Sequence, residues 1–130
     1  MRTLSLVLCV LWIQLVRAEE APTNAGVFWA RIWSDCHQDQ DVELAMRKCS
    51  TLLTLAESAL ARGRLGNIFY EKCDFDAAFE QFDSGDARMM SATARLRYAD
   101  MVKRSPWYIS RKLIPQTLCA SVLSSIVLSK

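Results

Sequence analysis

The acidic side chains of one short stretch have types and spacings that could carry acid-base or metal chemistry. They are Asp74, Asp76, Glu80 and Asp83. Neighbouring carboxylates can exchange a proton in catalysis, and several together can hold a calcium ion. A helix that begins after Asp74 explains them more simply, because Asp74 caps it, Asp76 is favoured by the dipole of the first turn, and the other two lie on a solvated face. We therefore predict structural roles for these acids.

Cys36 and His37 are the second candidate, as a thiolate nucleophile beside a base. Adjacent residues rarely present their side chains to each other, and no third group is placed to orient the base. His37 is the only histidine and no Cys-x-x-Cys pair occurs, so a zinc site is not expected. Phosphate-loop and nucleophile-elbow motifs are absent from the sequence. We predict a protein that is not an enzyme and that uses no cofactor or small-molecule substrate.

The N-terminal segment 1–18 has the features of a secretory signal peptide. Arg2 precedes an apolar run, Leu4–Val16, which is too short to span a bilayer comfortably. Val16-Arg17-Ala18 places small or branched residues where signal peptidase needs them. We expect cleavage near Ala18 and a periplasmic or secreted protein. Cleavage would also remove Arg17, leaving fourteen basic residues of the original sixteen against fourteen acidic ones. A neutral mature chain gives no electrostatic basis for binding nucleic acid.

Four cysteines would remain in the mature chain: Cys36, Cys49, Cys73 and Cys119. An even number in an exported protein favours disulfides, and the sequence alone leaves all three pairings open.

Most of the chain after the signal has the apolar periodicity of helices. Residues 19–40 are expected to form a flexible lead-in and a short aromatic helix at Val27–Trp33, whose aromatic side chains would fill the core. Helices are then expected from Asp41 to a break near Glu57–Ser58, and from there to Lys72. A third should run from Asp74 to Gly85, and a fourth over Arg88–Arg104. The apolar face of the fourth helix would consist of Ala92, Leu96, Ala99 and Val102.

An internal repeat connects two of these helices. DVELAMRKC at Asp41–Cys49 matches DFDAAFEQF at Asp74–Phe82, and we call the separation of Asp41 from Asp74 the repeat offset. The aspartate caps the helix, the small alanine lets two helices approach, and a larger side chain four residues later fills the gap. This pattern predicts a short stack of antiparallel helix pairs.

The second copy of the repeat resembles a tetratricopeptide repeat. The residues at the mutual spacings of that family are Leu65, Gly66, Phe69, Asp74, Phe75, Ala78 and Phe82. The resemblance implies that Gly66 and Ala78 are the small helix contacts beside the larger Phe69 and Phe82. The sequence departs from the family at Cys73, where a turn glycine is usual, and at Arg62, where an aromatic residue is usual.

The layout of Cys36 and Cys49 ahead of the repeat is similar to that of small exported bacterial tetratricopeptide proteins. The resemblance implies a disulfide between these two cysteines across the start of the first repeat helix. It also implies an inner groove in which Arg62 and Arg95 could bind an acidic peptide or the C-terminal carboxylate of a peptide. An ordinary solvated face is the alternative for these arginines.

The tail from residue 105 to residue 130 is expected to form an irregular helical cap over the last repeat, with Cys73–Cys119 as a candidate tie. Contact of the tail with a membrane surface is the less favoured alternative.

These observations predict an all-α protein with the repeat domain at 41–104: one good tetratricopeptide-like unit preceded by half a unit. Its expected function is non-catalytic protein binding or scaffolding in the cell envelope, with an unidentified protein or peptide partner. A small secreted, disulfide-stabilised helical effector or inhibitor is the alternative.

Overall fold

The computed structural model describes residues 24–126, and over these residues the protein is helical without a strand. The elements are α2 (Asn24–His37), α3 (Val42–Leu55), α4 (Ala59–Glu71), α5 (Phe75–Ser84), a 3-10 turn η1 (Ala87–Met89), α6 (Ala92–Lys103), α7 (Ser105–Ile109) and α8 (Gln116–Ser124). The predicted all-α class is confirmed. The expected signal peptide at 1–18 lies outside the described residues. Among the helices that are described, none combines the length and apolar character that crossing a membrane requires.

Side-chain caps begin four of the helices. The predicted caps Asp41 and Asp74 accept hydrogen bonds from backbone amides of the first turn, at 3.0 Å and 3.3 Å. Ser58 and Ser91 cap α4 and α6 in the same way. Each cap satisfies an otherwise unpaired N–H and contributes about 1 kcal/mol. The chain breaks at Ala56–Ser58 and at Gly85 therefore lie close to where the sequence predicts them.

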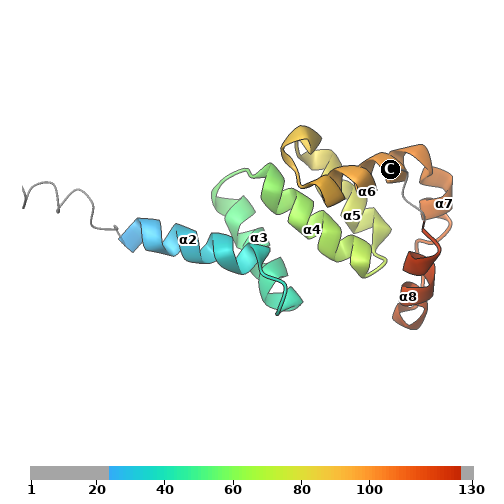
Figure 1. Ribbon diagram of the computed structural model, residues 1–130, viewed down its shortest axis with the longest axis horizontal. Helices are drawn as coiled ribbons and strands as arrows, with labels where there is room; N and C mark the ends of the chain where they lie inside the picture. The colour runs from blue at the N-terminus through green and yellow to red at the C-terminus, as the bar shows by residue number, and fades with distance from the viewer. Residues whose placement is uncertain (1–23, 127–130) are drawn as a thin grey trace, which may run out of the picture. The chain divides into compact units, whose positions relative to one another are not determined.

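The chain divides into two compact units between Arg31 and Ile32. Within the second unit, α4 occupies the centre and packs against α3, α5 and α6, as Figure 1 shows. Phe69 of α4 contacts both of its core clusters, one formed with α3 and one with α5, α6 and α7. The helix pairs thus form a short stack.

The core of this unit contains the residues that resemble repeat contacts. Leu65 is 2% exposed, and Ala78 and Phe82 are fully buried. Gly66 lies directly against the ring of Phe82, where a Cβ atom at residue 66 would approach Cε1 to 2.3 Å. The absence of a side chain at residue 66 is what lets α4 and α5 approach this closely.

The aromatic segment differs from the prediction. Helix α2 extends beyond Val27–Trp33, and Phe28, Trp29 and Trp33 are 40–55% exposed, so these rings do not fill the core. Ile32 and Cys36 are the buried residues of α2. They lie one helical turn apart and pack with α3, whereas Trp33 points about 100° away from Ile32. Ile32 and the Cys36–Cys49 disulfide thus attach the end of α2 to α3.

Helix α6 also uses a different face from the predicted one. Ala92, Leu96, Ala99 and Val102 are exposed, while Ala94 and Met101 are buried. The buried side meets α4 and α5, with Ala94 beside Gly63 and Tyr98 stacked near Phe82. The sequence shows two apolar stripes on this helix, and periodicity alone does not tell which one faces the core.

The tail folds as two short helices. α7 carries Pro106 in its first turn and buries Tyr108. α8 is joined by a disulfide from Cys119 to Cys73, at the turn between α4 and α5. Gln116 reinforces this attachment by donating a 2.6 Å hydrogen bond to the carbonyl of Lys72.

Candidate functional site

The acidic cluster of α5 does not form one site. Asp74 caps the helix, Asp76 lies 3.0 Å from the ammonium of Lys112, and Asp83 accepts a 2.6 Å hydrogen bond from Tyr98. Among the described residues, no group of three or more acidic, histidine or cysteine side chains could hold a metal ion. The acids therefore make separate contacts.

Cys36 is joined to Cys49 by a disulfide, with the Cα atoms 4.7 Å apart. The pairing that the resemblance implies is thus present, and Cys36 has no thiolate with which to act as a nucleophile. His37 makes a 2.9 Å contact between Nδ1 and the carbonyl of Trp33 and stacks on that indole ring, with the ring centres 4.2 Å apart.

Cys73 and Cys119 form the second disulfide, across 46 residues of sequence. Cys73 has a backbone φ of 58°, in the left-handed region that glycine adopts without strain. Cys73 thus has the backbone conformation for which a glycine would be the usual choice, and it has it in the turn between α4 and α5. The side chain at this position covalently attaches the tail.

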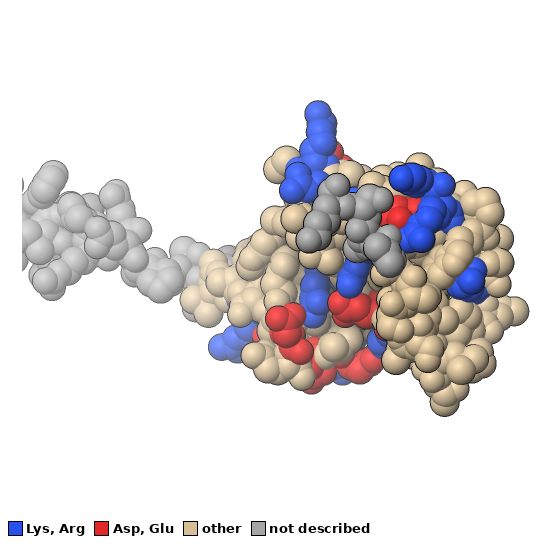
Figure 2. Space-filling model, turned by 45° about the vertical axis from the view of Figure 1, so that its right-hand side comes forward, with Lys and Arg blue, Asp and Glu red and all other residues tan. Residues whose placement is uncertain are grey.

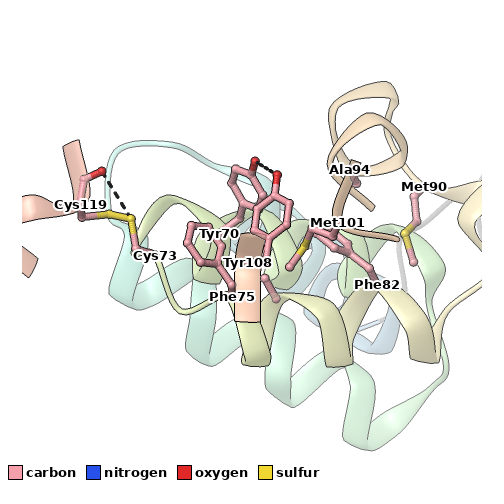
Figure 3. Close-up of a cluster of buried hydrophobic side chains, with 10 residues drawn as sticks. Tyr70, Cys73, Phe75, Phe82, Met90, Ala94, Met101, Tyr108 and Cys119 are labelled. Carbon is pink, nitrogen blue, oxygen red and sulfur yellow. Dashed lines mark hydrogen bonds between the residues drawn. A yellow bond between two sulfur atoms is a disulfide. The ribbon is translucent and has the colours of Figure 1, made fainter. Parts of the chain in front are cut away.

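A buried polar network joins α4, α6 and α7, and the sequence gives little sign of it. Tyr108 donates a hydrogen bond to Asp100, and the hydroxyls of Tyr70 and Tyr108 lie 2.9 Å apart, pointing toward each other in Figure 3. Arg104 binds both carboxylate oxygens of Asp100, at 2.8 Å and 2.6 Å. Arg97 lies 4.6 Å from the centre of the Tyr70 ring. The i, i+4 spacing of Asp100 and Arg104 is the one sequence signal that could have indicated part of it.

The electrostatics of this network favour one protonation state. Burial, followed by the hydrogen bond with Asp100, raises the pKa of Tyr108 far above its usual range. Burial alone would raise the pKa of Asp100, but hydrogen bonds from Arg104 and Tyr108 outweigh it and hold that pKa below its ordinary value. Neutral tyrosines around a paired carboxylate fix α7 in place. Every group in the network already has its partner, so the arrangement is structural.

A cleft of about 460 Å³ lies between α5 and the segment that follows α6. Its apolar lining comes from Phe75, Phe79, Met101, Tyr108 and Ile109, and its polar lining from Asp76, Glu80, Ser105 and Lys112. The ion pair between Asp76 and Lys112 already uses two of its charged groups. The apolar part of the cleft could receive an apolar side chain.

The two arginines predicted to bind a peptide have different surroundings. Arg62 pairs with Glu57 at 2.6 Å and donates to Gln81 of α5 at 3.2 Å. The hydrogen bond with Glu57 is the largest cause of its raised pKa, and the charge of Glu80 adds to it. Arg95 is exposed on α6. Residues 62 and 95 are separated by the repeat offset and therefore occupy equivalent positions in the repeat, but they share no contact partner.

Arg95 belongs to a side of α6 that no other element within residues 24–126 covers. We call this side the open face of α6. It consists of Ala92, Arg95, Leu96, Ala99, Val102 and Lys103, all of which are exposed. Two of its large apolar residues, Leu96 and Val102, are 46% and 55% exposed. A hollow of about 90 Å³, bordered by Leu96, Ala99, Asp100 and Lys103, lies on it.

The open face is basic. Within residues 24–126 no ion pair involves Arg95 or Lys103, and the same is true of Arg31, Arg47, Lys48 and Arg111. Asp100, the acidic residue of α6, is 7% exposed and bound by Arg104. Over parts of the face drawn in Figure 2, basic and acidic side chains lie next to each other.

Comparison of the chain with protein-family models, with curated proteins and with solved structures gave no match. The functional argument therefore depends on the geometry of this chain.

Proposed function

We propose that this protein is a non-catalytic protein-binding or scaffold module, built on a tetratricopeptide-like helix stack, and that the open face of α6 is its binding surface. Two disulfides favour an oxidising compartment outside the cytoplasm. Export by a cleaved signal peptide accounts for that location, and N-terminal mass analysis of exported protein should find a chain beginning at Glu19.

The observation that carries the proposal is the relation between α4 and α6. Three residues of α4 correspond to three residues of α6 when the repeat offset is added to their numbers. Arg62 corresponds to Arg95, Gly66 to Ala99 and Phe69 to Val102. On α4 these positions are covered: Gly66 lies against Phe82, Arg62 bonds to Gln81 and Phe69 is partly buried. On α6 the equivalent positions are exposed. The stack thus ends on a face whose counterpart one repeat earlier packs against another helix.

The described part of the tail, residues 105–126, does not cover the open face. α7 is five residues long, and its Tyr108 bonds to Asp100, which borders the open face, and to Tyr70 of α4. α8 is held at Cys73 by its disulfide. An uncovered apolar face between basic residues is the kind of surface at which soluble proteins bind partners.

A photo-crosslinking amino acid placed at residue 96 of the full chain tests the proposal in the exported fraction of the source cell. The same amino acid at Thr51, an exposed position of α3, is the control. We expect a discrete crosslinked protein from position 96, its loss when Arg95→Glu is added, and no such product from position 51. Absence of a product at position 96, or an identical product from both positions, would overturn the proposal.

A further inference from the structure

Resting on the proposed function, we infer that the partner presents an acidic amphipathic helix with an aliphatic side chain at its centre. This helix takes the place beside α6 that α5 takes beside α4. The α4–α5 interface serves as a template for the missing contact.

The first step concerns shape. Phe82 of α5 packs on Gly66, where no Cβ is present. The equivalent residue of α6 is Ala99, whose Cβ occupies part of the corresponding space, so a phenyl ring in the same position would clash. The hollow of about 90 Å³ beside Ala99 suits a smaller side chain such as Leu, Ile or Met.

The second step decides which position the partner helix occupies. On α4, Gly63 lets the start of α6 approach, since a Cβ there would lie 3.2 Å from the Cβ atoms of Ala94 and Met90. The equivalent residue on α6 is Leu96, which is too large for such an approach. A helix can therefore pack over Ala99 and Val102, as α5 does over α4, but not in the position that α6 itself occupies.

The third step concerns charge. On α4, Arg62 donates to Gln81 of α5, and the charge of Glu80 contributes to its raised pKa. Arg95 is the equivalent of Arg62, and Lys103 lies two turns from Arg95 on the same face. Acidic side chains on the partner helix would complement both. A second copy of this chain, docked through the same face, would place these basic residues against each other, and this disfavours self-association.

Helix α5 supplies the probe peptide. A lactam-stapled peptide with the sequence of residues 74–85 and the change Phe82→Leu is acidic, apolar on one face and carries an aliphatic side chain at the required position. The staple is needed because an isolated helix of this length is marginal in water. Binding to the full chain is measured by fluorescence anisotropy at low and at high salt.

We expect saturable binding that weakens at least tenfold in Arg95→Glu/Lys103→Glu and that weakens as salt rises. Arg47→Glu, at an exposed position of α3, is the matched charge reversal and should leave binding unchanged. Ala99→Phe, which fills the hollow, should abolish binding without a change in thermal stability. Equal binding to all variants, or equal binding of a peptide with its acids changed to lysine, would overturn the inference.

The two proposals fail separately. If position 96 crosslinks a partner in cells but the acidic peptide neither binds nor competes with it, the open face remains the binding surface and the acidic-helix inference is wrong. If sedimentation shows a dimer that Arg95→Glu disrupts, the occupant is a second copy and the inference is likewise wrong.

Discussion

Gly66 and Phe82 are in such close contact that any side chain at residue 66 would collide with the phenyl ring, with a Cβ only 2.3 Å from Cε1. This contact joins the two central helices, α4 and α5, at a point where both are buried. It also shows why the Leu65-Gly66 pair is present in the sequence.

The variant Gly66→Ala should lower the free energy of unfolding by about 1–3 kcal/mol through overpacking, although alanine is favoured over glycine in a helix by about 1 kcal/mol. Urea denaturation measures the change. Gly63→Ala is the comparison, because a Cβ there would make a tight contact of 3.2 Å with Ala94 and Met90 but would not overlap a ring, so its loss of stability should be smaller. The loss at residue 66 should shrink in a Phe82→Leu background, and an undiminished loss would contradict the proposed clash.

Cys73 combines a disulfide with a left-handed backbone, and these two effects can be separated. Changing both Cys73 and Cys119 to serine opens a loop of 46 residues, for which we expect a loss of about 4 kcal/mol. Cys73→Gly/Cys119→Ser should recover about 1 kcal/mol of this loss, because glycine adopts a φ of 58° without strain. Thermal unfolding compares the two variants. Equal stabilities would show that the backbone at residue 73 relaxes once the bond is absent.

The two faces of α6 should respond differently to substitution. Met101→Ala shortens a side chain that is 2% exposed, and it should lower the free energy of unfolding by about 2–5 kcal/mol. Leu96→Gln and Val102→Gln change exposed side chains and should alter stability by less than about 0.5 kcal/mol in the isolated protein. Chemical denaturation of the three variants measures this difference. A large loss at Leu96 would mean that the open face is covered within the free chain.

The carboxylate of Asp100 should make stability depend on pH in the acid range. Its pKa is lowered in the folded protein, so the stabilisation is present above its ordinary pKa of about 4 and is lost as pH falls through the lower, folded-state value. At pH 7 the free energy of unfolding of the native protein should exceed that of the Asp100→Asn variant by about 1–3 kcal/mol. The difference should shrink below about pH 4. A constant difference from pH 7 to pH 3 would show that the charge of Asp100 contributes nothing.

The sequence predicted helix caps correctly and the burial of the aromatic residues incorrectly. The caps Asp41 and Asp74 and the helix end at Gly85 were predictable, because capping depends on residues within one turn. The aromatic residues around Trp29 were predicted to be buried, and three of them are exposed. Burial depends on which neighbouring element reaches a side chain, and no local pattern contains that information.

The candidate site shows the same division. Arg62 and Arg95 occupy equivalent positions in the repeat, and the repeat offset that relates them is visible in the sequence. Arg62 bonds to Gln81 of α5, whereas Arg95 is exposed, and this difference depends on which helices pack beside α4 and α6. The hydrogen bonds among Tyr70, Tyr108 and Asp100 join residues up to 38 positions apart, and their spacing gave no signal.

The sequence by itself determined the helical class, the caps, the repeat offset and the presence of four cysteines available for disulfides. These features depend on interactions between residues near each other in the chain, or on composition. Only the tertiary structure decided which cysteines pair, which of the two apolar faces of α6 is buried, and that the face with Ala99 stays open. The physical reason is that α6 can bury only one face against α4 and α5, and the choice depends on how all the helices pack together.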